Sequence, residues 1–200
     1  MQPAPPTLGR RERNKQEKLD RITAAARELF TQYGVDEVTT QQVAEKADVG
    51  SGTLFLYAKT KAELLLLVHN AKYAQALAAG VDAAAAEVAV LDAVMAIIRP
   101  IIECNRVQIE NGRTYLREIV FGDPAEPHHA EALSLTIQTE AATAEVFSRD
   151  EHLVARGPEK LSRIVSSIMF ISMTSSATIE MTDAQVGDEI RDQISVLLGA

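Results

Sequence analysis

The sequence predicts an all-α protein, with an N-terminal three-helix domain followed by a larger helical bundle. Its 200 residues include long segments rich in Ala, Leu and Ile, only 4% aromatic residues, and few clusters of Pro and Gly. Strands favour alternating aromatic and β-branched residues, whereas apolar residues three and four positions apart favour helices. A chain of this length has enough residues for one ordinary domain or two small ones.

The first 33 residues are expected to form an arm and a helix. Residues 1–14 predict a disordered basic arm, because three prolines precede a run of basic residues. Apolar residues then recur at helical spacing from Ile22 to Tyr33. Gly34 follows at once, as expected for a residue that ends a helix in the left-handed conformation.

Two short helices joined by a tight turn are expected next. Thr39 and Gln42 have the spacing of a capping box, which begins the second helix. Asp48 tolerates the left-handed backbone of a tight turn. A third short helix, TLFLY, follows the two glycines after it, and Leu54 is its expected buried anchor. Residues 15–61 are therefore expected to form a helix-turn-helix domain.

The remaining residues, 62–200, are expected to form a helical bundle. Thr60 and Glu63 give a second capping box ahead of a long fourth helix. Pro100 is expected to kink or break the next helix, because proline lacks a backbone N–H. The segment after Pro158 is apolar around much of its circumference, so it must be buried in a core or against another subunit. Further helices are expected near residues 83–110, 113–121, 127–149, 158–180 and 184–198.

Charge and composition narrow the possible functions. Residues 1–61 carry ten Lys and Arg against eight Asp and Glu, a net charge of +2, whereas residues 62–200 carry ten against twenty, a net charge of −10. A basic front can attract phosphate, although a solvated helix face has the same composition. An apolar run of about 18 residues and a signal peptide are both lacking, which predicts a cytoplasmic protein without a membrane span. Cys104 is the single cysteine, so no intrachain disulfide can form.

The two short helices have features that suit DNA reading. In a helix-turn-helix, the second helix enters the major groove, whose base edges present a distinguishable pattern. Its first residues must be small and polar so that the backbone can come close, as Ser51, Gly52 and Thr53 are. Lys61 and the basic arm can reach phosphates. Helical bundles also contain short capped helices, so this pattern alone leaves DNA binding and a plain bundle both open.

Residues 22–67 resemble the N-terminal domain of the tetracycline-repressor (TetR) family of one-component bacterial regulators. The resemblance rests on the stretch ITAAARELFTQYGVDEVTTQQVAEKADVGSGTLFLYAKTKAELL and covers about a quarter of the chain. It implies a helix-turn-helix domain and a helical domain for regulation and dimerisation. The implied function is sequence-specific binding of a double-stranded DNA operator. Its landmarks are Ala26, Leu29, Phe30, Gly34, Thr39, Thr40, Val43, Ala44, Val49, Gly52, Thr53, Leu54, Lys61 and Leu64.

The resemblance also implies a division of the DNA contacts. Phosphate contacts are expected at Thr40, Thr53 and Lys61, and base contacts at Gln41 and Ser51. Glutamine can pair with adenine through two hydrogen bonds, whereas serine reads little sequence by itself.

Three neighbouring positions complete the expected DNA surface. Gly52 allows close approach of the backbone. Phe55 stands where the family often has a phosphate-contacting tyrosine, so that hydroxyl is missing. Tyr57 occupies a frequent histidine position and can supply a hydroxyl instead.

The resemblance further implies a homodimer, and a small-molecule effector that binds between the central helices of the second domain. Candidate cavity walls are Met95, Ile98, Cys104, Tyr115, Phe121, Met169 and Met173, although core packing is the better explanation for any one of them. The dimer interface is expected on the last two long helices, at Leu161, Ile164, Ile168, Ile171, Ile190, Ile194 and Leu197, together with Val165, Ser175, Val186 and Leu198. The effector itself is not identified by the sequence.

Other function classes fit less well. An enzyme needs a nucleophile, an acid/base pair or a metal set, and the histidine spacing offers none of these. His128 and His129 with Glu131 suggest metal ligands, but adjacent histidines point to different sides of a helix. No cofactor is expected. A helical adaptor would explain the acidic body but not the basic arm, and an activator or a regulator without an effector remains an alternative to a repressor.

Overall fold

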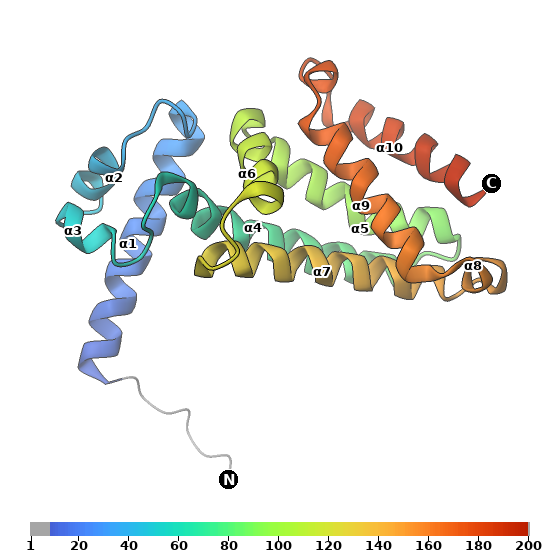
Figure 1. Ribbon diagram of the computed structural model, residues 1–200, viewed down its shortest axis with the longest axis horizontal. Helices are drawn as coiled ribbons and strands as arrows, with labels where there is room; N and C mark the ends of the chain where they lie inside the picture. Colours follow the sequence, from blue (N-terminus) through green and yellow to red (C-terminus); the bar gives the residue numbers. More distant parts are fainter. Residues whose placement is uncertain (1–8, 200) are drawn as a thin grey trace, which may run out of the picture. The chain divides into compact units, whose positions relative to one another are not determined.

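The computed structural model describes residues 9–199, and within them every regular element is helical (Figure 1). The chain divides into two compact units, one ending at Val68 and the other beginning at His69. This agrees with the all-α class predicted from the sequence. No helix in the described part of the chain is both long and apolar enough to cross a membrane.

The first unit contains three helices and the beginning of a fourth. Helix α1 spans Arg10–Tyr33, α2 spans Thr40–Lys46, α3 spans Ser51–Leu54, and α4 begins at Lys61 and continues to Ala84 in the second unit. Helix α2 packs against α1 and α3. Their shared core consists of apolar side chains from each helix, including Ile22, Ala26, Phe30, Val43, Ala44 and Leu54.

The expectation of a disordered arm is wrong for its described part. Residues 1–8 lie outside the described residues, and from Arg10 onward the chain is helical. The residues after Gly9 include no proline or glycine to interrupt the first turns of α1. A hydrogen bond between the side chains of Gln16 and Asp20 (2.7 Å) adds support one turn apart.

The turn between α2 and α3 confirms the local signals in the sequence. Thr39 and Gln42 form both hydrogen bonds of the capping box. Asp48 has a φ of 51°, the left-handed conformation expected of it, and its carboxylate lies 3.2 Å from the guanidinium of Arg21. Helix α3 begins at Ser51, two residues earlier than predicted, and hydrogen-bonded turns continue to Ala58.

The second unit is a bundle of long helices with a short one inserted. Helix α7 packs against α5, α6 and α9, while α10 packs against α5 and α9. In Figure 1, α9 crosses α5 and leads into the C-terminal helix. The elements are α5 (Val90–Arg106), α6 (Ile109–Phe121), α7 (Pro127–Phe147), α8 (Glu151–Arg156), α9 (Pro158–Thr174), the 3₁₀ turn Ser176–Thr178, and α10 (Asp183–Leu198).

Four features of the second unit differ from the sequence prediction. The alanine-rich stretch belongs to the end of α4 and a turn, so α5 begins at Val90 rather than near residue 83. Pro100 lies inside an unbroken α5. The short α8 was not predicted, although Asp150 caps it by accepting hydrogen bonds from the backbone of His152 and Leu153. Helix α9 ends at Thr174, where the backbone of Ser175 becomes extended.

Candidate functional site

The small polar residues at the beginning of α3 are accessible. Ser51 and Gly52 are exposed and Thr53 is half-buried, whereas Leu54 is buried beneath them, as predicted. Leu54 therefore anchors the short helix and leaves its N-terminal end open to a partner. A Cβ atom added at Gly52 would meet nothing within 4 Å, so this surface is not covered by other parts of the chain.

Helix α2 contributes a second polar surface to the same unit. Thr40 is half-buried at its first position, and Gln41 is exposed beside it. The amide of Gln41 donates a hydrogen bond to the carboxylate of Glu45 at 3.0 Å, one turn along the helix. A base contact by Gln41 would have to replace this exposed hydrogen bond, which costs little in water.

Two of the predicted DNA-contacting side chains, Tyr57 and Lys61, make hydrogen bonds to the backbone of the same unit. The hydroxyl of Tyr57 donates to the backbone carbonyl of Lys15 in α1 (3.0 Å), which a phosphate would have to displace. Lys61 donates to the carbonyl of Asp36 (3.1 Å), and its ammonium has two further hydrogens for other acceptors. Phe55 is exposed rather than packed in the core.

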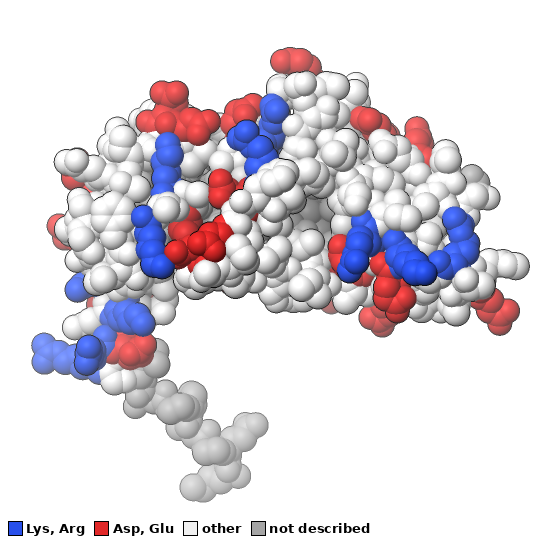
Figure 2. Space-filling model, in the orientation of Figure 1, with Lys and Arg blue, Asp and Glu red and all other residues white. Residues whose placement is uncertain are grey.

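The N-terminal half of α1 presents a basic surface. Figure 2 shows Lys and Arg gathered along this stretch. All of the basic residues in this stretch are exposed: Arg10, Arg11, Arg13, Lys15 and Lys18. The unit carries a net positive charge while the chain as a whole is acidic, so this surface has the charge that favours an anionic partner.

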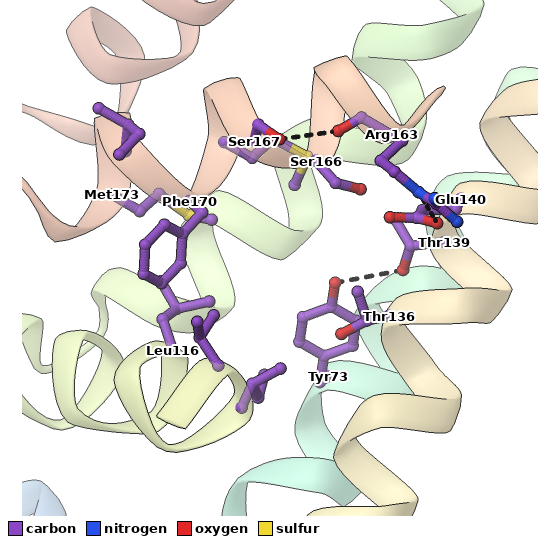
Figure 3. Close-up of a pocket in the computed structure, with 14 residues that line it drawn as sticks. Tyr73, Leu116, Thr136, Thr139, Glu140, Arg163, Ser166, Ser167, Phe170 and Met173 are labelled. Atoms are coloured by element: carbon purple, nitrogen blue, oxygen red, sulfur yellow. Dashed lines mark hydrogen bonds and ion pairs between the residues drawn. The ribbon is translucent and has the colours of Figure 1, made fainter. Parts of the chain in front are cut away.

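The second unit contains a cavity of about 410 Å³, lined by residues of α4, α6, α7 and α9 (Figure 3). One end is apolar, with Leu116, Phe170 and Met173 at its wall. The other end is polar, and there the side chains of Thr136, Thr139 and Glu140 from α7 lie beside Tyr73 from α4. The remaining lining residues are Ile119, Val120, Arg163, Ser166, Ser167, Met169 and Ile171.

Only two of the seven predicted cavity walls line this cavity. Met169 and Met173 do so, from α9. Met95 and Ile98 are buried in α5 as core residues, and Phe121 is exposed at the end of α6. The sequence carried no signal for the other lining residues, because a cavity is the space left where four helices diverge.

Tyr115 and Cys104 instead belong to a buried polar cluster with His69. The rings of His69 and Tyr115 lie 4.2 Å apart, and the Cys104 sulfur lies 3.9 Å from Nε2 of His69. Tyr115 donates to the side-chain oxygen of Asn70 (3.0 Å). Burial raises the pKa of Tyr115 and of the Cys104 thiol, so both remain protonated at neutral pH.

The same burial makes His69 a determinant of acid stability. Burial, and next the positive charge of Lys72, lower the pKa of His69 from 6.5 to about 4. The folded state therefore favours the neutral ring, and this contribution is complete above pH 6.5 and is lost as the pH falls through 4. We expect His69→Gln to flatten the fall of unfolding free energy between these values, measured by urea denaturation at several pH values.

The absolute free energy of unfolding of His69→Gln does not test this prediction, because the substitution also disturbs packing. The test is the slope of the unfolding free energy against pH. In the control His152→Gln, where the histidine is exposed, this slope should remain that of the wild type. An unchanged slope in His69→Gln would show that His69 does not titrate with folding.

The predicted dimer surface is divided between core and exterior. Leu161, Ile190 and Ile194 are buried inside the protomer, so the expectation that they form an interface is wrong. Val165 and Val186 are buried in the same way. The residues that remain accessible are Ile164, Ile168, Ile171 and Ser175 of the α9 segment and Leu197 and Leu198 of α10.

The histidine pair does not form a metal site. His129 is buried, with Nε2 3.2 Å from the backbone oxygen of Ile119. His128 faces Glu131 instead, at 3.9 Å. Among residues 9–199, no group of three or more His, Cys, Asp or Glu side chains is arranged to hold a metal ion.

Comparison with known proteins shows that solved structures share this fold. Crystal structures with the same fold include Thermus thermophilus FadR (TM-score 0.67, 21% identity, covering 90% of this chain and 92% of that one) and a TetR transcriptional regulator from Rhodococcus sp. RHA1 (0.62, 19%, 92% and 97%). Salmonella enterica GusR is similar as well (0.59, 19%, 92% and 96%). No curated protein sequence matches the chain.

The sequence model of the family described as "Bacterial regulatory proteins, tetR family" matches residues 22–68. This range contains most of α1, all of α2 and α3, and the first turns of α4. The match and the shared fold agree with the resemblance drawn from the sequence, and they assign the first unit to DNA binding. Over residues 22–68 the chain is similar to the tetR family of bacterial regulatory proteins, and over most of its length it shares the fold of such regulators.

Proposed function

We propose that the protein is a homodimeric transcriptional repressor, released from its DNA operator by a small-molecule effector. The observation that carries this proposal is the presence in one chain of a DNA-binding unit and, in a second unit, a cavity of about 410 Å³. Such a volume lies within the typical range for small-molecule sites, and its mostly apolar wall with a few polar groups is typical of them. DNA as the partner implies work in the bacterial cytoplasm.

One structural relative supports a ligand-controlled repressor. Thermus thermophilus FadR is described as a transcriptional repressor in complex with lauroyl-CoA, so a protein of this fold binds a small molecule. An effector needs only to favour a dimer whose two α3 helices do not fit successive major grooves. The coupling free energy is then the difference between the free energies of ligand binding to the two arrangements of the dimer.

The DNA contacts are proposed at the accessible residues of α2 and α3. Gln41 and Ser51 face the bases, and Thr40, Thr53 and Lys61 face phosphates. Gly52 allows the backbone to approach, and Phe55 and Tyr57 extend the surface beyond α3. The exposure of Ser51, Gly52 and Gln41 supports this assignment.

The dimer is proposed to form through a stripe of α9 in which Ile164 and Ile171 are exposed and Ile168 is half-buried. Ile164, Ile168 and Ile171 are spaced by four and three residues, so they share one face of the helix. Isoleucines this accessible in a row are more typical of a contact surface than of a solvated helix. Two half-sites in the operator then match the two-fold symmetry of the dimer.

Lys61→Ala and Gln41→Ala should weaken DNA binding in different ways. Lys61→Ala removes one phosphate contact per subunit, which weakens binding to all sequences and lowers the salt slope by roughly two for the dimer. Gln41→Ala should cost about 1–3 kcal/mol per half-site, and only on the specific operator. The measurement is fluorescence anisotropy over a salt series, with duplexes enriched from a random library by the wild type and with unselected duplexes.

Two controls separate DNA contact from damage to the fold. Because Lys61 also binds the carbonyl of Asp36, both variants are checked by thermal unfolding. Glu45→Ala removes the hydrogen-bond partner of Gln41 without removing Gln41, and it should retain specific binding. If both variants keep wild-type affinity for every duplex, α2 and α3 are not the reading surface. In vitro transcription from a promoter with the enriched operator then distinguishes a repressor from an activator.

A further inference from the structure

The polar end of the cavity is dominated by hydrogen-bond acceptors. The hydroxyl of Thr139 donates to the carbonyl of Leu135 (2.9 Å), so the hydrogen bond of 3.2 Å between Thr139 and Tyr73 must be donated by Tyr73. The hydroxyl hydrogen of Tyr73 is therefore used inside the protein. Burial raises the pKa of Tyr73 to about 12, so this hydroxyl keeps its hydrogen at neutral pH.

Other hydroxyl groups at the cavity wall also donate their hydrogens within the protein. Thr136 donates to the carbonyl of Ala132 (3.2 Å), and Ser167 donates to the carbonyl of Arg163 (3.0 Å). Each of these hydroxyls offers a ligand its lone pairs and no hydrogen. Ser166 is the lining hydroxyl that can donate as well as accept.

Of the two charged side chains that line the cavity, the acidic one is the more buried. The side chain of Glu140 is only 23% exposed, whereas that of Arg163 is 79% exposed and its Nε lies 3.9 Å from the carboxylate of Glu140. That distance is too long for a hydrogen bond, and a pair whose cation lies mostly in solvent is weak. Glu140 therefore remains an acceptor within the wall, and the guanidinium of Arg163, which lies beside it, is mostly solvated.

We propose that the effector of this cavity has an apolar body and a protonated primary or secondary amine. The amine lies at the polar end, donating to the Glu140 carboxylate and to the oxygens of Tyr73 and Thr136, and the body lies against Leu116, Phe170 and Met173. A carboxylate there would face lone pairs and the charge of Glu140, with few donors to satisfy it. This proposal rests on the proposed function, because it takes the cavity as the effector site.

Four decyl compounds test the ligand class by isothermal titration calorimetry on the full-length protein. Decylammonium, decyltrimethylammonium, decanol and decanoate share one chain and differ only at the head group. We expect decylammonium to bind about tenfold or more tightly than decanol and decanoate, because only it pairs charge with N–H donors. The affinity of decyltrimethylammonium should lie between that of decylammonium and those of the other two compounds, because it carries the charge without an N–H donor.

Three variants locate the head group. Glu140→Gln should weaken decylammonium by about tenfold or more and leave decanol within about twofold. Thr136→Val should reduce the ratio of the affinities for decylammonium and decyltrimethylammonium. The substitution removes a hydrogen-bond acceptor and leaves the side-chain volume nearly unchanged. Arg163→Gln should not weaken decylammonium. The matched control is Glu145→Gln, at an exposed glutamate of α7 outside the cavity lining.

The proposal is overturned if decylammonium does not bind, if decanoate binds best and depends on Arg163, or if Glu140→Gln has no effect. Release of the enriched operator, measured separately by anisotropy, distinguishes this failure from failure of the proposed function. Decylammonium that binds through Glu140 without releasing DNA upholds the ligand class and contradicts the effector role. Release of the operator by decanoate in the Glu140→Gln variant would uphold the effector role of the cavity and contradict the proposed ligand class.

Discussion

Glutamate at both Ile164 and Ile171 should convert the dimer into monomers and lower operator affinity by about a thousandfold or more. The substitutions place two charges per protomer in the proposed interface, where each must lose its hydration without an opposite charge to pair with. A monomer binds one half-site and loses the gain from the second, so the specific complex is affected far more than non-specific binding. Light scattering measures the mass, and anisotropy measures the affinity.

Both residues lie outside the core of the protomer, and because Ile171 also lines the cavity, operator affinity is measured without ligand. Ile171 is 63% exposed and Ile164 is 45% exposed, so neither charge disturbs the core of the protomer. Ile137 of α7 is 65% exposed, and Ile137→Glu therefore serves as a matched control that should remain dimeric. A double variant that stays dimeric and keeps its operator affinity would place the interface elsewhere.

Local sequence signals predicted the DNA-binding unit well. The capping box at Thr39, the helix end at Gly34 and the left-handed Asp48 each depend on a few neighbouring residues. Such signals survive in any tertiary context, because they satisfy backbone groups within one turn. Leu54 was predictable for a related reason, as the apolar anchor of a helix of four residues must be buried.

The second unit shows where this kind of reasoning fails. Helix α9 has apolar residues on more than one face, and periodicity does not say which face meets the core of its own chain. The structure buries Leu161 and Val165 and leaves Ile164 and Ile171 accessible. On α10, Ile190 and Ile194 are buried inside the protomer, so they cannot form the predicted interface. Only the tertiary structure reveals this.

The cavity was the least predictable feature. Its polar end combines Tyr73 of α4 with Thr136 and Glu140 of α7, more than 60 positions apart in the sequence. Neither segment contains a sequence pattern that identifies the other as its neighbour. The role of Thr139 depends on a hydrogen bond to Leu135 within its own helix, which decides the donor in its contact with Tyr73.

Gly112→Ala should lower the free energy of unfolding of the second unit by about 2–4 kcal/mol, although alanine favours helices over glycine by about 1 kcal/mol. Gly112 lies in the first turn of α6, directly after the turn that follows α5. A Cβ atom built there would lie 1.8 Å from the backbone oxygen of Asn105, which is far inside any contact distance. The neighbour is backbone rather than a flexible side chain, so α6 itself must move.

That movement should also affect the cavity, because Leu116, Ile119 and Val120 line it from the same helix. We therefore expect Gly112→Ala to bind decylammonium less tightly while the first unit retains its non-specific affinity for DNA. Gly52→Ala is the control for stability, since its Cβ would meet nothing within 4 Å, and it should unfold at the wild-type urea concentration or slightly above. A Gly112→Ala protein within about 0.5 kcal/mol of the wild type would mean that α5 and α6 can separate without cost, and that the close approach of α6 to Asn105 does not fix the position of the cavity wall.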